Sequence, residues 1–221
     1  MRRGIVLALM LLPCRAFAAD IAITDDQDDT TVLVVRNGDT ASIADNVTIS
    51  NFTPANNPQP NVKRGGYISI DAAPNSLFIG NGVSFVNIVG DGSGGAIKAL
   101  NGFTMGDNAL FEDNQAGGAG YAAGGAMYIR LSNPDSLSVQ PDNPLVSIGS
   151  GAAFDGNSSG VAGGAILLEY GRLEIGSGAV FSGNSSTYGG ALAILPDASN
   201  GSEIPSASIG TGATFSGNSA T

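Results

Sequence analysis

Residues 163–192 read GGAILLEYGRLEIGSGAVFSGNSSTYGGAL, and this stretch holds one whole copy of a unit that recurs along the chain. A glycine pair, Gly163-Gly164, opens a strand-like run with alternate apolar residues. A second apolar run then passes through Gly176-Ser177-Gly178 to the motif Phe-x-x-Asn at 181–184, and Gly189-Gly190 starts the next unit. Internal repeats of a few tens of residues are typical of solenoids.

Six ten-residue segments align on the second half of this unit. The first, fifth and seventh residues of each segment are apolar, and in an extended chain residues of one parity point to one face. The fourth residue is always Gly or Asn, the types that adopt positive φ most readily. We therefore expect a strand that bends at the same place in every copy. The segments are residues 43–52, 79–88, 105–114, 148–157, 175–184 and 209–218.

Paired glycines precede five of the six segments, and the second and fourth residues after each pair are apolar. This period of two predicts a strand rather than a helix. The third residue after the pair varies in type, so we expect it on the outer surface; it is Ser69, Lys98, Tyr128, Leu167 or Ala193.

Stacking identical positions coil on coil would produce continuous rows of Phe and Asn, in which the Asn side chains hydrogen-bond along the axis. We therefore predict an all-β, right-handed parallel β-helix of about six coils, the hand following the rule for parallel crossovers. An antiparallel sandwich also has alternating strands, but it does not explain the recurring corner and closing Asn. The repeat residues are Phe111, Asn114, Phe154, Asn157, Phe181, Asn184, Phe215 and Asn218, with the pair glycines Gly95, Gly125, Gly164 and Gly190.

The first 18 residues have the features of a signal peptide. Arg2 and Arg3 are followed by an apolar run at 5–12 and by Ala-Phe-Ala at 16–18, which predicts cleavage before Ala19. The protein is then exported, to the outer-membrane surface or the extracellular space. We assign residues 19–40 to an N-terminal lead-in or cap and 41–221 to the β-helix.

Cys14 offers an alternative to simple cleavage, because it follows two leucines as a lipoprotein cysteine does. Pro13 stands where a small residue is expected, which disfavours lipidation.

The composition excludes several classes of function. The chain has 9 Lys and Arg against 19 Asp and Glu, a net charge of −10, and three of the nine basic residues lie in the signal peptide. This disfavours binding to nucleic acid or to anionic lipid. Histidine is absent, and with it the commonest general base and metal ligand. We expect no cofactor and no enzymatic activity.

A polysaccharide lyase or hydrolase is the alternative, and three residues are its candidates. Lys98 and Arg130 follow paired glycines on adjacent coils, and Glu169 holds the position of Arg130 one coil further on. We expect Arg130 and Glu169 to form an exposed ion pair, which contributes little stability. A hydrolase needs two carboxylates at a fixed separation, but Asp45 and Asp107 occupy turn positions that suit Asp for local reasons.

Two further features are candidates for binding. Asp25, Asp26, Asp28 and Asp29 could supply oxygen ligands to calcium, but their spacing fits no calcium loop, which favours a solvated lead-in and no metal site. Long loops at 132–144 and 196–206 leave the same side of the coil, where insertions often mark a binding edge. Drift in an unselected surface loop is the alternative.

The two motifs together resemble the polymorphic outer membrane proteins of chlamydiae and related autotransporter passengers. The resemblance implies a secreted β-helical passenger that a C-terminal outer-membrane β-barrel carries to the surface, often for adhesion to a host-cell protein or glycan. The chain departs from that pattern because no barrel follows and it ends without a capping repeat, so we expect a truncated frame or a fragment that does not itself insert into the membrane. The motifs are Gly-Gly-Ala-Ile/Met/Leu at 94–97, 124–127, 163–166 and 189–192, and Phe-x-x-Asn at 111–114, 154–157, 181–184 and 215–218.

Overall fold

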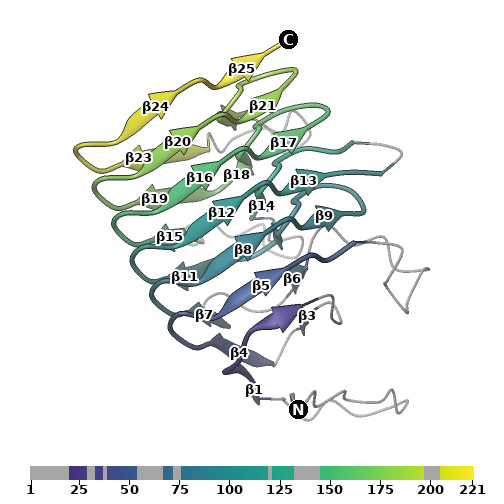
Figure 1. Ribbon diagram of the computed structural model, residues 1–221, viewed down its shortest axis with the longest axis vertical. Coiled ribbons are helices and arrows are strands. Elements are labelled where there is room, and N and C mark those ends of the chain that lie inside the picture. The colour runs from purple at the N-terminus through teal and green to yellow at the C-terminus, as the bar shows by residue number, and fades with distance from the viewer. Residues whose placement is uncertain are drawn as a thin grey trace, which may run out of the picture.

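The computed structural model is built from parallel β-strands. Throughout the residues it describes, every regular element is a strand, and the strands stack into four parallel sheets that wind around one axis (Figure 1). The predicted all-β parallel β-helix is confirmed. The predicted signal peptide lies outside the described residues, which are 20–28, 33–36, 39–53, 67–71, 76–118, 121–131, 145–196 and 205–221.

The predicted bent strand is two strands in two sheets, joined at the Gly or Asn corner. Sheet A consists of β1 (Asp20–Ile23), β4 (Thr40–Ile43), β7 (Leu77–Ile79), β11 (Phe103–Met105), β15 (Leu145–Ile148), β19 (Arg172–Ile175) and β23 (Ser206–Ile209). Sheet B consists of β2 (Gln27–Asp28), β5 (Thr48–Ser50), β8 (Ser84–Val86), β12 (Leu110–Glu112), β16 (Ala153–Asp155), β20 (Val180–Ser182) and β24 (Thr214–Ser216).

The strands that follow the paired glycines form sheet C, and short strands after the Phe-x-x-Asn position form sheet D, which the sequence did not predict. Sheet C consists of β3 (Leu33–Arg36), β6 (Ile68–Asp71), β10 (Ile97–Ala99), β14 (Met127–Arg130), β18 (Ile166–Tyr170) and β22 (Leu192–Ile194). Sheet D consists of β9 (Val89–Gly90), β13 (Gln115–Ala116), β17 (Ser158–Ser159), β21 (Ser185–Ser186) and β25 (Ser219–Ala220).

A full coil therefore runs through sheets A, B, D and C in that order. In Figure 1 the strands of sheet B face the viewer and run to the right as the coil rises toward the C-terminus, so the solenoid is right-handed. The coil also begins before the first of the six segments, because Ile23 of β1 pairs in register with Ile43 of β4. The described part of the lead-in is thus continuous with the sheets.

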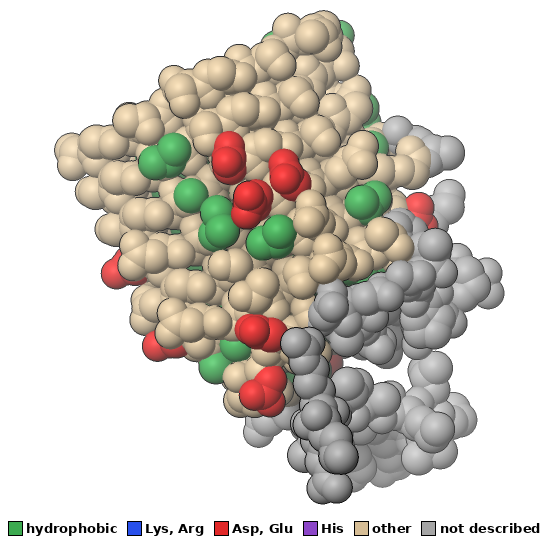
Figure 2. Space-filling model, viewed as in Figure 1, with side chains coloured by type: hydrophobic (Ala, Val, Ile, Leu, Met, Phe, Trp, Pro, Cys, Tyr) green, Lys and Arg blue, Asp and Glu red, His purple; other side chains and the backbone are tan. Residues whose placement is uncertain are grey.

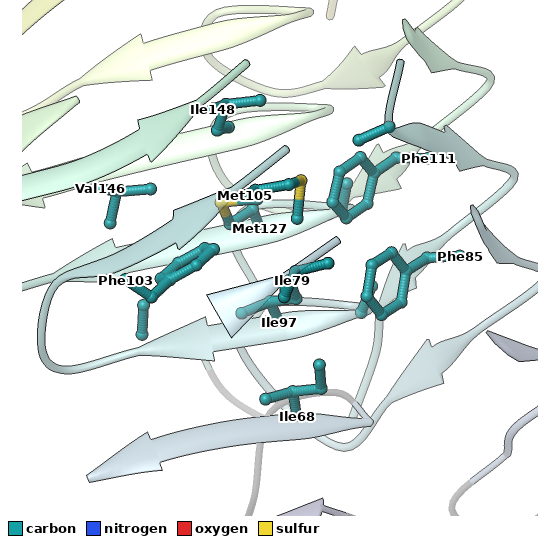
Figure 3. Packing of buried hydrophobic residues seen from close by; sticks show 14 of the residues in the cluster. Ile68, Ile79, Phe85, Ile97, Phe103, Met105, Phe111, Met127, Val146 and Ile148 are labelled. Atoms are coloured by element: carbon teal, nitrogen blue, oxygen red, sulfur yellow. The ribbon is translucent and has the colours of Figure 1, made fainter. Parts of the chain in front are cut away.

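Residues of one parity fill the interior, as the segments predict. Phe85, Phe111, Phe154 and Phe181 are fully buried. Their rings stack in one row with neighbouring centroids 4.8–5.0 Å apart, close to the spacing of adjacent strands. Figure 3 shows Phe85 and Phe111 one above the other, beside aliphatic residues from the other sheets. The row ends at Phe215, whose side chain is 53% exposed.

Glycine recurs at two positions of the repeat for different physical reasons. The fourth residue of every segment has a φ between 58° and 75°, as the choice of Gly or Asn there predicts. In the glycine pairs that the structure describes, the second glycine instead lies against the next coil: a Cβ on Gly125 would collide with the carbonyl oxygen of Gly164, and one on Gly164 with that of Gly190. The coils can approach at this corner only where the residue that faces the backbone of the next coil lacks a side chain.

Candidate functional site

The Asn of each Phe-x-x-Asn motif forms an interior hydrogen-bonded row. The Asn157 Oδ1 accepts hydrogen bonds from the backbone N–H and the Nδ2 of Asn114, at 3.0 and 2.9 Å. Its Nδ2 donates to the Phe111 carbonyl and to Asn184 Oδ1, both at 3.0 Å. All four hydrogen-bonding positions of this buried amide are therefore used. The same pattern continues through Asn184 to Asn218. We refer to Asn114, Asn157, Asn184 and Asn218 as the Asn ladder.

A second polar row lies on the outside of the corner between sheets A and B. Asp45 Oδ1 accepts the backbone N–H of Asn81, Asn81 Oδ1 accepts that of Asp107, and Asp107 Oδ1 accepts that of Ser150, at 2.7–2.8 Å. Asp45 and Asp107 therefore bind backbone groups of neighbouring coils. Their interpretation as turn residues agrees with these contacts, and the inter-coil bonding was not predicted.

The outer face of sheet C differs from the expectation for it. Tyr128, Leu167 and Ala193 were predicted on the surface, but all three are buried. The prediction was wrong because the segments before the paired glycines pack over these strands: Ala123 and Ala162 join the three residues in a second apolar cluster. In the earlier strands of sheet C the equivalent residue remains partly exposed, as Lys98 does.

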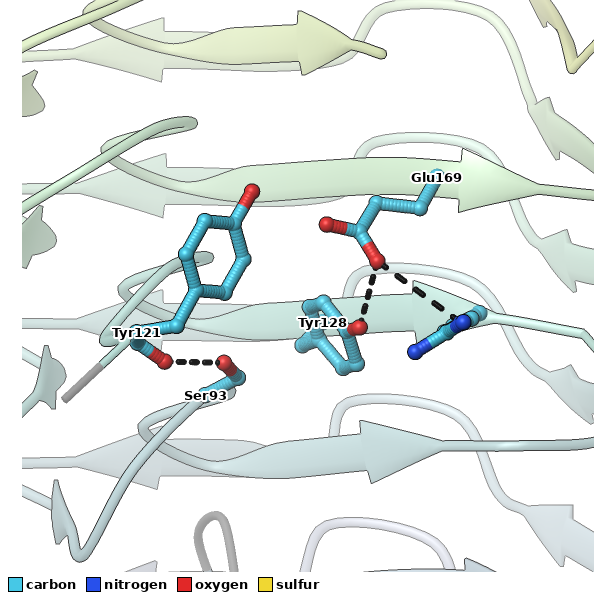
Figure 4. Close-up of polar contacts among 5 residues, drawn as sticks. Ser93, Tyr121, Tyr128 and Glu169 are labelled. Atoms are coloured by element: carbon cyan, nitrogen blue, oxygen red, sulfur yellow. Dashed lines mark hydrogen bonds and ion pairs between the residues drawn. The ribbon is translucent and has the colours of Figure 1, made fainter. Parts of the chain in front are cut away.

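At the edge of this cluster, side chains from two coils form a polar group, which we call the Tyr-Glu-Arg cluster: Tyr128, Arg130 and Glu169. The Tyr128 hydroxyl donates to Glu169 Oε2 at 2.5 Å, and Arg130 Nε lies 3.9 Å from the same oxygen (Figure 4). The Arg130 side chain is 41% exposed and that of Glu169 only 15%. The sequence predicted the ion pair of Arg130 and Glu169 but not the part of Tyr128.

An irregularity in the backbone positions this carboxylate. Strands β14 and β18 pair Ile129 with Leu168 but Arg130 with Tyr170, so Glu169 is an extra residue in β18. A bulge of this kind redirects a side chain and often lies beside a functional site. Here it places Glu169 against Tyr128, whereas unbroken register would have placed it opposite Arg130.

Tyr121 lies next to the Tyr-Glu-Arg cluster and remains 48% exposed. Its backbone carbonyl accepts a hydrogen bond from the Ser93 hydroxyl at 2.7 Å, which ties it to the preceding coil. Burial and then hydrogen bonding to Glu169 raise the pKa of Tyr121 to about 12. The same two causes raise the pKa of Tyr128 still further. Both phenols therefore stay protonated at neutral pH, where they act as hydrogen-bond donors.

The remaining candidates are dispersed. Lys98 is in register with Tyr128 on the neighbouring strand. Asp26 Oδ1 accepts the backbone N–H of Thr48 at 2.7 Å, and Asp25 accepts a hydrogen bond from Thr24. Asp29, the side chain of Asp28 and the loop 132–144 lie outside the described residues, as does most of 196–206. Within the described ranges, no group of three or more His, Cys, Asp or Glu side chains could hold a metal ion.

No family model, curated protein or solved structure matches this chain. In the described part of the chain, no helix has the length and apolar character needed to cross a bilayer. What this site can do chemically follows from the groups of the Tyr-Glu-Arg cluster and of the neighbouring Tyr121. The Glu169 carboxylate, the Arg130 guanidinium and the exposed Tyr121 ring present acceptors, donors and an apolar surface within one small area.

Proposed function

We propose that this protein is an exported β-helical passenger module that is displayed on the cell surface and acts as a scaffold for binding. The observation that carries the proposal is the in-register stacking of the two motifs that resemble autotransporter passengers. The paired glycines meet one another at one corner, as Gly125 and Gly164 do, and the Asn ladder follows another corner. Such a stack separates a repeated interior from outer faces that are free to vary.

The charge of the molecule supports an extracellular role. The net charge of −10 favours solubility of an exposed repeat protein. On the outer face of sheet B, Glu112 lies in register with Asp155, and Asp113 follows it. Figure 2 shows acidic and apolar side chains on this face, with no Lys or Arg among the described residues in view.

Surface display is tested by fusing residues 1–221, followed by an epitope tag, to the outer-membrane β-barrel of an autotransporter and expressing the fusion in a Gram-negative host. We expect protease added to intact cells to remove the tag-linked protein, and we expect a variant without residues 2–18 to be protected inside the cell. Protection of both forms would contradict the proposal.

A polysaccharide-active enzyme is the second candidate, and one observation favours it. Glu169 is a partly buried carboxylate held by a protonated phenol and a guanidinium, which is the type of group that carries general acid–base chemistry. Incubating the purified protein with pectin, alginate and host glycans, with and without calcium, distinguishes the two. Turnover that is lost in Glu169→Gln would favour the enzyme; unchanged substrates favour the binding scaffold.

A further inference from the structure

We propose that the outer face of sheet C, at Tyr121, Arg130 and Glu169, binds a neutral pyranose unit of a glycan. The inference deepens the proposed function and rests on it for the biological setting, since the site would serve as a contact point of the displayed scaffold. The three residues come from two successive coils at the edge of the second apolar cluster. Tyr121 lies beside Glu169 in Figure 4, and Arg130 Nε lies 3.9 Å from Glu169 Oε2.

Tyr121 supplies the apolar part of the site. A pyranose has one face of C–H groups, which packs on an aromatic ring as other apolar surfaces do. Tyr121 is 48% exposed, and the bond from Ser93 to its carbonyl fixes its backbone. A tyrosine offers contact area at little cost in conformational entropy, because it has only two side-chain torsions.

Glu169 and Arg130 supply the polar part. Sugar hydroxyls both donate and accept hydrogen bonds, and a carboxylate next to a guanidinium offers acceptors and donors in adjacent planar groups. Glu169 Oε2 is occupied by Tyr128 and lies near Arg130. The bulge and the Tyr128 hydroxyl hold Glu169 in place before any ligand arrives, and such preorganisation lowers the entropic cost of binding.

Charge favours a neutral sugar over an acidic one. The charges of Glu169 and Arg130 largely offset each other within the site, but the chain as a whole carries −10. A uronate or sialate would be repelled at long range by this field. A neutral pyranose has no such penalty, and its hydroxyl groups can donate hydrogen bonds to the carboxylate.

The test is saturation-transfer NMR and titration calorimetry on the purified protein, with lactose, maltotriose and chitotriose as neutral probes and trigalacturonate as the acidic one. We expect at least one neutral probe to bind, and Tyr121→Ala and Glu169→Gln each to weaken it about tenfold or more. Arg130→Gln should weaken it as well.

Two matched controls separate the site from the general surface. Arg172 is 42% exposed, pairs with Glu174 on sheet A and resembles Arg130 in both respects. Phe78 is an aromatic residue on sheet A that is 54% exposed. We expect Arg172→Gln and Phe78→Ala to bind the sugar as the unaltered protein does. Failure of every neutral probe, tighter binding of trigalacturonate, or equal losses in the controls would overturn the inference.

The two proposals fail separately. If cells display the protein but no neutral probe binds, only the sugar site is wrong. If the probes bind and Tyr121→Ala removes binding, but the protein is not displayed, the site stands and the passenger function is wrong. Thermal unfolding of each variant is measured alongside, and because Tyr121 is half-exposed we expect Tyr121→Ala to melt within a few degrees of the unaltered protein.

Discussion

The two ends of the solenoid fill the same interior position with different types of side chain, apolar in the earlier coils and amide in the later ones. From β12 onward the tenth residue of each segment is an Asn of the ladder, whereas in the two earlier coils the same position holds Phe52 and Ile88, both buried. The Phe row continues past this change without interruption from Phe85 to Phe111. The interior position therefore accepts an apolar side chain or a fully bonded amide. The amide depends on its neighbours, because each Asn supplies the partners of the next.

The neighbouring corner also changes, one coil after the ladder begins. The residue before the ladder position has positive φ throughout, but it is Asn51, Asn87 and Asp113 in the earlier coils and Gly in the three later ones, at 156, 183 and 217. The later coils thus combine an amide ladder with unstrained corners. This pairing suggests that the regular Asn row and the glycine corner stabilise one repeated geometry together.

The largest losses of unfolding free energy are expected in the Phe row, which runs through both regions. Phe85→Ala and Phe154→Ala each remove a fully buried ring from the same row, and each should cost about 3–5 kcal/mol of unfolding free energy. Urea unfolding followed by circular dichroism measures both. A loss several times smaller at Phe85 would show that the earlier coils pack more loosely than the structure describes.

Asn157→Leu should cost about 3 kcal/mol. It leaves the backbone N–H of Asn114 and the carbonyl of Phe111 buried without their partners, and each unsatisfied group costs about 1–3 kcal/mol. The same urea titration gives the value. An unchanged unfolding free energy in Asn157→Leu would mean that the ladder position tolerates apolar residues in every coil.

The reverse change, Ile88→Asn, should cost only about 1 kcal/mol, because the new amide loses apolar burial but gains the side-chain oxygen of Asn114 as an acceptor. At present that oxygen accepts the Ile88 backbone N–H at 3.1 Å. Ile88→Ala, which offers no hydrogen bond, is the control and should cost about 2 kcal/mol or more. Equal costs for the two variants would contradict an extendable ladder.

Asp113→Gly should stabilise the protein by about 0.5–1 kcal/mol. Asp113 has a φ of 53°, at the position where the later coils have Gly, so the change relieves the strain of a side chain in that region. Thermal unfolding should show a raised midpoint. The matched change Gly156→Asp should lower it, and a shift of the same sign in both would refute the argument from backbone strain.

The smallest effect concerns the Tyr-Glu-Arg cluster and pH. The pKa values of Tyr121 and Tyr128 are raised above 10, so the folded protein keeps protons that the unfolded chain releases. Their contribution is full below pH 10 and is lost as pH rises toward 12 and beyond. Unfolding free energy measured from pH 8 to 11 should therefore fall less steeply at the alkaline end in Tyr128→Phe. The same dependence of unfolding free energy on pH in Tyr128→Phe and in the unaltered protein would contradict this explanation.

The sequence predicted the interior well and the outer faces poorly, for a physical reason. Interior positions contact their own equivalents in the next coil, so the corner glycines and the Asn ladder show as a repeated pattern. The burial of Tyr128 and Leu167 depends on segments that differ between coils, so the sequence repeat does not predict it. The bulge at Glu169 was likewise hidden, although a Tyr three residues and a Glu five residues after paired glycines on adjacent coils was a usable signal.

A double-mutant cycle tests most directly whether the Asn ladder acts as one coupled unit. The four proteins are the unaltered chain, Asn157→Leu, Asn184→Leu and the double variant, compared by urea unfolding. Because the two amides bond each other at 3.0 Å, the double variant should be more stable than the summed single losses predict, by about 1–2 kcal/mol. Strict additivity would contradict the account, since it would mean that each Asn contributes alone.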